Sequence, residues 1–301
     1  MPYRLSEGIP GIQDYLDLLQ SDDFREMESF SDRFIAANRK ELARYSHRWA
    51  IDPLHQWSRQ WEYPFVHCRI RQIASGTGSL RILDAGSGVT FFPHFMLSQF
   101  HQAQMYCSDR DGRLAEIHAR VSRKAGNLIP FVQADLRKLL YPDEWFDIVY
   151  CISVLEHTRD YAEILDEFHR VLRPGGSLIV TFDVSLDGTR DLDLENGSLL
   201  LKAMAARFDT TDGLSLDLGA HAARPQAFTT LAARDINRRL LPWRFPVFMY
   251  RAKNLLAGKP AGSWPPLLSV FCVSLQKRDA AQEPRLPSHA DALQVPGAHG
   301  L

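Results

Sequence analysis

The sequence has few cysteines and almost no excess charge of either sign. Its four cysteines, Cys68, Cys107, Cys151 and Cys272, are far apart, and none forms a C-x-x-C pair. This spacing argues against a zinc site or a disulfide framework and favours buried free thiols. The formal net charge of -1 excludes a global basic field that would attract nucleic acid or an anionic membrane.

Long apolar runs are also lacking. No run approaches the roughly 20 apolar residues that a helix needs to cross a membrane. The first residues contain no apolar core of the length found in signal peptides. We therefore expect a soluble, cytoplasmic protein. With 45% hydrophobic and 24% charged residues, the 301-residue chain has enough apolar material for a large core.

The middle of the chain alternates between strand and helix patterns. Short apolar segments with the length and composition of buried strands occur at 81–85, 104–109, 128–135, 145–153 and 177–184. Helical patterns separate them at 91–100, 112–124 and 159–172. Such alternation with short connections predicts a parallel sheet covered by helices. "RPGG", 173–176, is predicted to stop the last of these helices and form a turn.

The regions on either side of this core have other patterns. Residues 12–50 space their apolar residues by three and four, which predicts helices. Residues 53–73 are rich in aromatics and arginine, and Pro64 predicts a short helix, a turn and a second helix there. Further on, 229–241 is predicted to be helical and 267–277 to be a final strand, with a weaker strand pattern near 246–250.

We divide the chain into four parts on these grounds. They are an N-terminal helical cap at 1–77, a core at 78–184, a variable insertion with the completion of the sheet at 185–278, and a tail at 279–301. The tail has several prolines and few bulky apolar residues, so we expect it to be disordered.

A glycine-rich turn follows the first predicted strand. Gly86 and Gly88 allow the backbone to turn sharply and let a ligand approach without a Cβ in the way. Thr90 is the expected N-cap of the next helix, and Pro93 falls in its first turn. The end of a strand and the start of a helix meet here, which is where open α/β sheets bind ligands.

Two ligand classes compete for this turn. The dinucleotide fingerprint G-x-G-x-x-G needs a third glycine, but the sequence has Phe91 in that position. Asp84, two residues before the first glycine, would also repel a pyrophosphate. A carboxylate there suits a ligand with a cationic group and no phosphates, and S-adenosylmethionine is such a ligand.

Two further acids end the next two strands. Asp109 can accept hydrogen bonds from the hydroxyl groups of a ribose, and Asp135 can accept one from the amino group of adenine. Asp111 is a possible substitute for Asp109, which we favour because it ends the apolar run. A single aspartate at such a position is usually only a turn-former, but three in register with the glycine turn predict a site.

These segments resemble those of the class I S-adenosylmethionine-dependent methyltransferases, over about residues 78–184. The resemblance is carried by "ILDAGSG", "CSDRD", "VQADL", "FDIVYCISVLEH" and "EFHRVLRPGGSLIVT". The last two are similar to the small-molecule (type 11-like) branch of that family. The resemblance implies an α/β fold with a doubly wound, Rossmann-like sheet of seven strands, mostly parallel with an antiparallel last strand. Thr90 stands where the family often has a third glycine.

The resemblance also implies a cofactor site for S-adenosylmethionine, formed by the residues that match the family's motifs. They are Asp84, Ala85, Gly86, Ser87, Gly88, Asp109, Arg110, Ala134, Asp135, Leu136, Cys151 and Ile152. The implied activity is methyl transfer to an oxygen or nitrogen atom of a small or medium-sized organic acceptor. We keep two alternatives: an NAD-dependent oxidoreductase, which Asp84 and the missing glycine disfavour, and a non-catalytic module that binds S-adenosylmethionine.

The acceptor side is less defined by the sequence. His157 in "LEH" is a candidate general base, since its ordinary pKa is about 6.5, or a helix-start histidine held by hydrogen bonds. Trp61 and Tyr63 come from the aromatic segment before the core and are candidates for the substrate pocket. Asp183, at the end of the fifth strand, either contacts the substrate or caps a turn. We expect no metal site.

Overall fold

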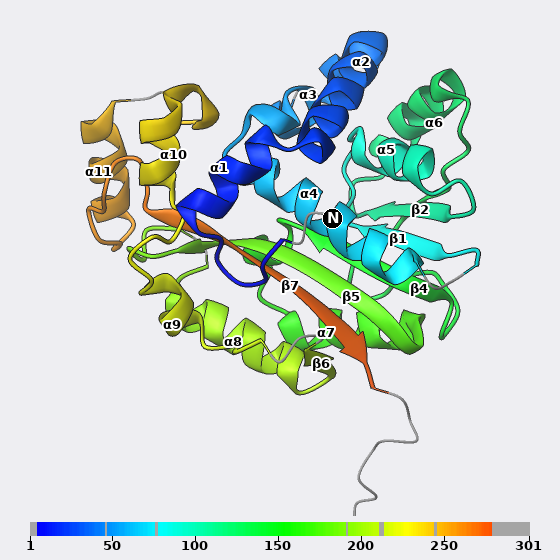
Figure 1. The fold of residues 1–301 in the computed structure, drawn as a ribbon. Helices are drawn as coiled ribbons and strands as arrows, with labels where there is room; N and C mark the ends of the chain where they lie inside the picture. Colours follow the sequence, from blue (N-terminus) through cyan, green and yellow to red (C-terminus); the bar gives the residue numbers. More distant parts are fainter. Residues whose placement is uncertain are drawn as a thin grey trace, which may run out of the picture.

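The fold is described from a computed structural model. The residues described are 5–45, 47–75, 78–190, 192–210, 214–243 and 246–278, so the predicted tail at 279–301 lies outside them. Figure 1 shows a central twisted sheet with helices on both sides of it.

The sheet has seven strands in the order β3-β2-β1-β4-β5-β7-β6. Their bounds are β1 (Arg81–Ala85), β2 (Gln104–Asp109), β3 (Phe131–Gln133), β4 (Phe146–Ile152), β5 (Leu172–Ser185), β6 (Phe208–Thr210) and β7 (Leu268–Lys277). The first five strands pair in parallel, whereas β7 is antiparallel to both β5 and β6. The predicted mostly parallel sheet with an antiparallel last strand is confirmed.

Neighbouring residues of each central strand are buried in different apolar clusters. Ile82 and Tyr150 belong to the cluster on one face of the sheet, while Leu83 and Cys151 belong to the cluster on the other face. Side chains alternate between the faces of a strand, so a strand covered on both faces is apolar throughout. This is why the strands read as continuous apolar runs in the sequence.

The first cluster packs beneath the N-terminal helices and the first crossover helices. Its helices are α1 (Ile12–Gln20), α2 (Asp22–Tyr45), α4 (Arg59–Ala74), α5 (Phe92–Gln99) and α6 (Leu114–Ala125). The second cluster packs against α7 (Tyr161–Val171) and α8 (Leu194–Ala205). Figure 1 shows α7 and α8 below the sheet and the N-terminal helices above it.

Short elements complete the described chain. They are α3 (Arg48–Ile51), η1 (Pro53–His55), η2 (Leu155–His157), α9 (Leu218–Ala222), α10 (Thr230–Ile236), η3 (Arg238–Leu240) and α11 (Val247–Leu256). The weak strand pattern near 246–250 was misleading, because this segment begins α11.

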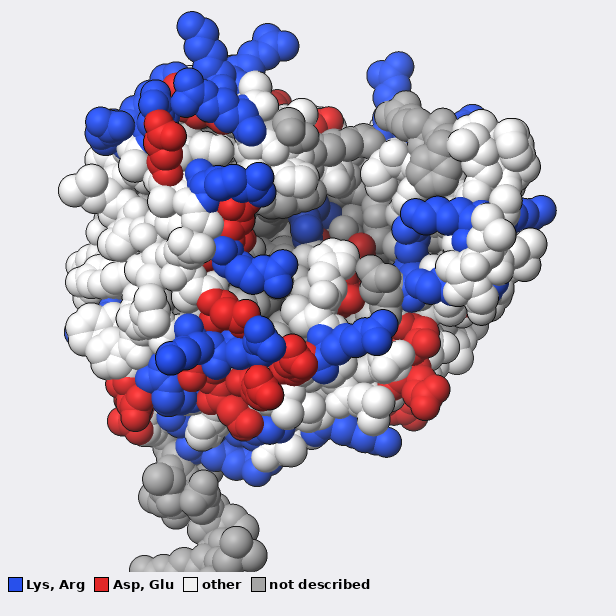
Figure 2. Space-filling view, turned by 180° about the vertical axis from the view of Figure 1, so that it is seen from behind, with Lys and Arg blue, Asp and Glu red and all other residues white. Residues whose placement is uncertain are grey.

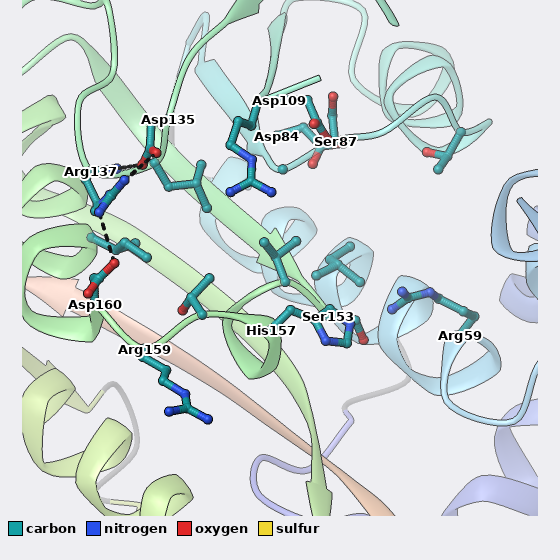
Figure 3. A pocket seen from close by; sticks show the side chains of 18 of the residues that line it. Arg59, Asp84, Ser87, Asp109, Asp135, Arg137, Ser153, His157, Arg159 and Asp160 are labelled. Carbon is teal, nitrogen blue, oxygen red and sulfur yellow. Dashed lines mark hydrogen bonds and ion pairs between the residues drawn. The ribbon is translucent and has the colours of Figure 1, made fainter. Parts of the chain in front are cut away.

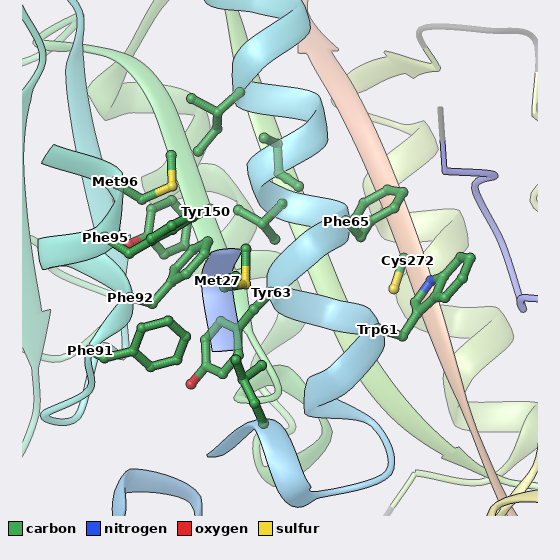
Figure 4. Close-up of a cluster of buried hydrophobic side chains, with 14 of the residues drawn as sticks. Met27, Trp61, Tyr63, Phe65, Phe91, Phe92, Phe95, Met96, Tyr150 and Cys272 are labelled. Atoms are coloured by element: carbon green, nitrogen blue, oxygen red, sulfur yellow. The ribbon is translucent and has the colours of Figure 1, made fainter. Parts of the chain in front are cut away.

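The predicted break at Pro64 is wrong, because α4 continues through it. A proline inside a helix removes one backbone hydrogen bond and costs roughly 3 kcal/mol. Every residue from Gln60 to Ile70 is buried, so α4 lies between the sheet and the outer helices (Figure 4). The burial of apolar side chains on all sides of the helix offsets the loss of one hydrogen bond.

The segment "RPGG" also differs from its prediction. Helix α7 ends at Val171 as expected, but the following residues belong to β5, where the pairing with β4 shifts in register between Phe146 and Ile148. Gly175 has a φ of 70°, which a glycine adopts without strain. The glycines therefore form an irregular start of β5.

All four cysteines are buried free thiols, as predicted. Within the described ranges, no helix combines the length and the apolar character that crossing a bilayer requires.

Candidate functional site

A cavity of about 500 Å³ lies at the carboxyl ends of the parallel strands. This volume is within the usual range for small-molecule sites. Its wall consists of Tyr45, Arg59, Tyr63, Asp84, Gly86, Ser87, Thr90, Asp109, Arg110, Asp135, Leu136, Arg137, Ile152, Ser153, Val154, His157, Thr158, Arg159, Asp160 and Ile164. Figure 3 shows the strand-end acids on one side of this cavity and Arg59 of α4 on the other.

The glycine turn is fixed by hydrogen bonds to β2. The backbone N–H groups of Gly86 and Ser87 both donate to the carbonyl of Ser108, at 2.7 and 3.0 Å. Gly86 has a φ of 80°, and a Cβ added there would lie 2.7 Å from the side chain of Val154. Glycine is therefore required at this position by both conformation and space.

Both backbone polar groups of Gly88, its N–H and its carbonyl, form hydrogen bonds. Its N–H donates to Asp109 Oδ2 at 3.0 Å, and its carbonyl lies 2.5 Å from Nε2 of His118 on α6. Burial lowers the pKa of His118 to about 4, so this ring is neutral at physiological pH and donates its single N–H to the carbonyl. His118 was not predicted as part of the site, and it positions the turn.

Asp84 is the deepest of the three strand-end acids. Its side chain is 5% exposed, and the hydroxyl of Tyr150 donates to Oδ2 at 3.0 Å. Burial raises the pKa of Asp84 to about 8; the Tyr150 hydrogen bond lowers it, and the charge of Asp109 raises it. The charge of Arg59 also lowers this pKa, but too weakly to offset burial. The ammonium group of S-adenosylmethionine would supply a cation in direct contact with this buried carboxyl group.

Asp109 and Asp111 have different surroundings. Asp109 lines the cavity, and its carboxylate accepts hydrogen bonds from the backbone of Gly88 and of Asp111. Asp111 is bound by Arg113 at 2.7–3.1 Å and is not part of the cavity wall. The preference for Asp109 over Asp111 therefore agrees with their positions.

Asp135 lies at the outer end of the cavity and is already bound by arginine. Arg137 donates to both of its carboxylate oxygens at 2.9–3.0 Å and reaches Asp160 with its other nitrogen at 3.0 Å. These hydrogen bonds lower the pKa of Asp135 to about 2.

Figure 2 shows a hollow on the back face of the molecule with acidic and basic side chains mixed along its rim.

Most of the predicted site residues line the same cavity. From the cofactor set these are Asp84, Gly86, Ser87, Asp109, Arg110, Asp135, Leu136 and Ile152, and they are joined by His157 and Tyr63. The remaining cofactor residues, Ala85, Gly88, Ala134 and Cys151, are buried behind the wall. Asp183 is partly exposed at the end of β5 but is not part of the wall.

Trp61 does not reach the cavity. It is fully buried, and Figure 4 shows it on the side of α4 that faces Cys272 of β7, whereas Tyr63 lies among the phenylalanines of α5. Two positions along a helix differ by about 200° in direction, so Trp61 and Tyr63 cannot both point into one pocket. The predicted pocket role of Trp61 is corrected to core packing.

A buried polar network that was not predicted from the sequence begins at Arg59 and Glu62. The guanidinium of Arg59 contacts Glu62 Oε2 at 2.6 Å, and the hydroxyls of Ser153 and Thr181 both donate to Glu62 Oε1 at 2.6 Å. Burial alone would lower the pKa of Arg59, but the charge of Glu62 raises it. The spacing of three between Arg59 and Glu62 on a helix was the available signal.

This network also holds a strained residue at the end of β4. Ser153 lines the cavity with a φ of 48°, which is unusual for a residue with a Cβ. Its hydroxyl is fixed by Glu62 and its N–H donates to the carbonyl of Thr181 at 2.9 Å. The network therefore shapes this part of the cavity wall.

Comparisons with known proteins agree with this geometry. A family model described as a methyltransferase domain matches residues 83–180. A sterol 24-C-methyltransferase of Gibberella zeae is 27% identical over 204 residues, which are 65% of this chain and 51% of that protein. A demethylmenaquinone methyltransferase of Deinococcus radiodurans is 34% identical over 101 residues, which are 33% of this chain and 42% of that protein. The chain spans about half the length of the curated relatives it matches.

A solved structure supports the fold. It is that of a candidate sarcosine dimethylglycine methyltransferase from Galdieria sulphuraria, which aligns with 81% of this chain and 99% of its own, with a TM-score of 0.50 and 16% sequence identity. The matched domain contains the glycine turn, Asp109 and Asp135, together with the strands that place them around one cavity. Residues 83–180 therefore match a methyltransferase domain, and the fold and the strand-end site support S-adenosylmethionine as its cofactor.

Proposed function

We propose that this chain transfers the methyl group of S-adenosylmethionine to an oxygen or nitrogen atom of a small or medium-sized organic acceptor. The observation that carries the proposal is the meeting of three strand-end acids and the glycine turn around one cavity. When bound, the cofactor supplies a sulfonium methyl group that is already strongly electrophilic. The protein then contributes chiefly by holding the acceptor in line with that methyl group.

Each part of the cofactor has a proposed partner. Asp84 is proposed to bind the ammonium group beside the turn of Gly86 and Ser87, because it is a buried carboxyl group that lines the cavity at this turn. Asp109 is proposed to accept hydrogen bonds from the ribose hydroxyls, and Asp135 to accept one from the adenine amino group. The assignments follow the order of the strands, since β1, β2 and β3 are neighbours in the sheet.

The acceptor enters from the side covered by the N-terminal helices. Tyr45, Arg59 and Tyr63 come from this cap and line the cavity. His157 is exposed at the rim and is the proposed base for an acceptor that must lose a proton early. Arg59 and His157 are polar groups, which favours a heteroatom as the methylated atom.

The matched relatives support an organic acceptor of this size. Their names give a sterol and demethylmenaquinone, which are small or medium-sized organic molecules. We also propose a cytoplasmic location, because four free thiols are typical of proteins from a reducing compartment.

Calorimetry and product release test the function together. S-adenosylhomocysteine should bind the wild-type chain, and Asp84→Ala and Asp109→Ala should weaken this binding, with Asp111→Ala as the matched control. Release of S-adenosylhomocysteine from S-adenosylmethionine should depend on an acceptor from a panel of organic alcohols and amines. Absence of cofactor binding would contradict the proposal, and binding without release for every acceptor would favour a non-catalytic module.

A further inference from the structure

A second set of carboxyl groups lies beside the cavity, at the ends of β4 and β5. It consists of Glu62 on α4, Glu156 in η2 and Asp183 near the end of β5, and we name it the acceptor-side acid group. Arg59 and Ser153 line the cavity, and each contacts Glu62 directly. The acceptor-side acid group therefore begins immediately behind the cavity wall.

The residue spacing along helix α4 matches the spacing along strand β5, and this match brings the group together. Four residues along a helix and two along a strand both advance by about 6 Å and return to the same face. Glu62 contacts the hydroxyl of Thr181 at 2.6 Å. Ser58, four residues before Glu62, hydrogen-bonds to Asp183, two residues after Thr181. Asp183 therefore faces the first turn of α4, next to the Arg59 side of the cavity.

Two buried oxygen atoms of this group have no hydrogen-bond partner. They are Oε2 of Glu156, whose side chain is 5% exposed, and Oδ1 of Asp183. Leaving a buried carboxyl oxygen without a donor is costly, so such atoms indicate a place where a donor binds. They are not arranged to hold a metal, since no set of three metal-ligating side chains occurs in the described part of the chain.

Glu62 itself needs no further partner. Its charge is balanced by Arg59, and both of its oxygens accept hydrogen bonds, one of them from Ser153 and Thr181. Cys272 of β7 also faces the group, but burial raises the pKa of its thiol well above the ordinary value, and the charge of Glu62 adds to this rise. It stays a neutral thiol. The need for a cation therefore lies with the other two carboxyl groups.

Glu156 and Asp183 hold their protons while no cation is present. Burial raises the pKa of Asp183 to about 8, and the charge of Glu62 adds to the rise, whereas Arg59 and Ser58 oppose it. Burial also raises the pKa of Glu156 well above its ordinary range, and Asp183 and Glu62 add to that rise. A bound cation would reverse both effects.

We propose that the acceptor is an amine that binds as its ammonium ion to Asp183, with Glu156 as the second carboxyl group behind it. This inference rests on the proposed function and narrows the methylated atom to nitrogen. A primary ammonium has three N–H donors and a positive charge, so it carries enough donors for both unpartnered oxygens. An alcohol brings one donor and no charge, and an anionic acceptor would be repelled.

The same carboxyl group gives the reaction a route for its proton. Ammonium binding displaces the proton of Asp183 to solvent, and the ammonium then transfers one proton to the carboxylate. The exposed lone pair of the nitrogen forms the new N–C bond as the S–C bond breaks, and the bonding electrons stay on sulfur. The products are S-adenosylhomocysteine and a protonated methylated amine.

Matched amines and alcohols test this inference. The probes are benzylamine against benzyl alcohol and tyramine against tyrosol, titrated calorimetrically into the full chain saturated with S-adenosylhomocysteine. The variants are Asp183→Asn and Glu156→Gln, which keep the shape of each side chain. Asp166→Asn is the matched control, because Asp166 lies on α7, is 64% exposed and pairs with Arg207.

The wild-type chain is expected to bind at least one amine about tenfold or more tightly than its matched alcohol. Titrations in buffers of different ionisation enthalpy should show proton release on amine binding at pH 7. Asp183→Asn and Glu156→Gln should each lose about tenfold in amine affinity, and Asp183→Asn should also lose the proton release. Alcohol binding and S-adenosylhomocysteine affinity should stay unchanged in both variants. Asp166→Asn should match the wild type.

Three results would overturn the inference: equal affinity for amines and alcohols, amine binding that neither variant weakens, or no amine binding by the wild type. If Asp183→Asn does not fold, Glu156→Gln and the wild-type probe pairs decide the question. Failure of the wild-type chain to bind S-adenosylhomocysteine would instead contradict the proposed function.

Discussion

The acids that line the cofactor wall of the cavity differ in kind from those that lie behind its acceptor side. On the cofactor wall, Asp84, Asp109 and Asp135 each end one of three neighbouring strands. On the acceptor side, the packing of α4 on β5 brings Glu62 and Asp183 together. The contact between Glu62 and Thr181 joins residues that are 119 positions apart in the sequence. The cofactor wall is thus built by local strand-and-turn structure, and the acceptor side by tertiary packing.

The acids within the cofactor wall also differ from one another. Arginine at the surface lowers the pKa of Asp135 to about 2, while burial raises that of Asp84 to about 8. Asp135 is an ionised carboxylate that is already paired with arginine, whereas Asp84 needs a cation from the ligand. Cofactor affinity should therefore depend much more on Asp84 than on Asp135.

The largest effect is expected on the acceptor side, where Glu62→Leu leaves the Arg59 guanidinium without its partner. The side chain of Arg59 is only 13% exposed, and loss of one member of such a pair costs about 3–5 kcal/mol in the free energy of unfolding. Chemical denaturation measures this loss. The double variant Arg59→Met/Glu62→Leu should recover much of it, and a single variant as stable as the wild type would show that the network is dispensable.

On the cofactor wall, Asp109→Ala should weaken S-adenosylhomocysteine binding by about 10–100-fold. Asp109 both holds the N–H of Gly88 and is the proposed ribose partner, and hydrogen bonds to charged groups are worth about 1.5–3 kcal/mol. Calorimetry measures the change. Asp111→Ala should bind like the wild type; equal losses in both variants would indicate that the turn tolerates neither change and that Asp109 has no special contact.

A smaller effect is expected for His118→Ala, which removes one hydrogen bond to the carbonyl of Gly88. A neutral hydrogen bond contributes about 1 kcal/mol, so cofactor affinity should fall about fivefold. Because the pKa of His118 is about 4, this loss should be the same at pH 6 and pH 8. A loss that grows toward acid pH would contradict the assignment of a neutral ring.

The smallest effect is expected for Asp135→Asn. Its carboxylate is partly exposed and already bound by Arg137, so the change should weaken S-adenosylhomocysteine binding by about threefold or less. Equilibrium titration side by side with Asp109→Ala gives the comparison. An effect of Asp135→Asn as large as that of Asp109→Ala would reverse the order proposed for the cofactor wall.

The cofactor wall could be predicted from the sequence because its information is local. A buried parallel strand is a short apolar run, and Gly86 and Asp84 sit within two residues of its end. The order of strands then follows from right-handed crossovers. Eight predicted cofactor residues therefore line one cavity, although the partner of Asp84, the hydroxyl of Tyr150, lies 66 residues away and was not found.

The acceptor side could not be predicted in the same way. Pro64 favours a break in a helix that stands alone, but burial on all sides keeps α4 continuous. That continuity places Trp61 in the core, Tyr63 at the cavity and Glu62 against the sheet. Each of these outcomes depends on packing between distant segments. The residue pattern within one segment does not predict such packing.

The most direct test of the account is the pH dependence of S-adenosylhomocysteine binding, because Asp84 is its central residue. The pKa of Asp84 is about 8 in the empty site, and a bound ammonium group favours the ionised carboxylate. Binding must therefore release a proton, and affinity should rise with pH between 6 and 8, by up to about tenfold per pH unit. Calorimetry should show this rise in the wild type and a flat, weaker affinity in Asp84→Asn. A wild-type affinity that is independent of pH, or one that Asp84→Asn leaves unchanged, would contradict the account.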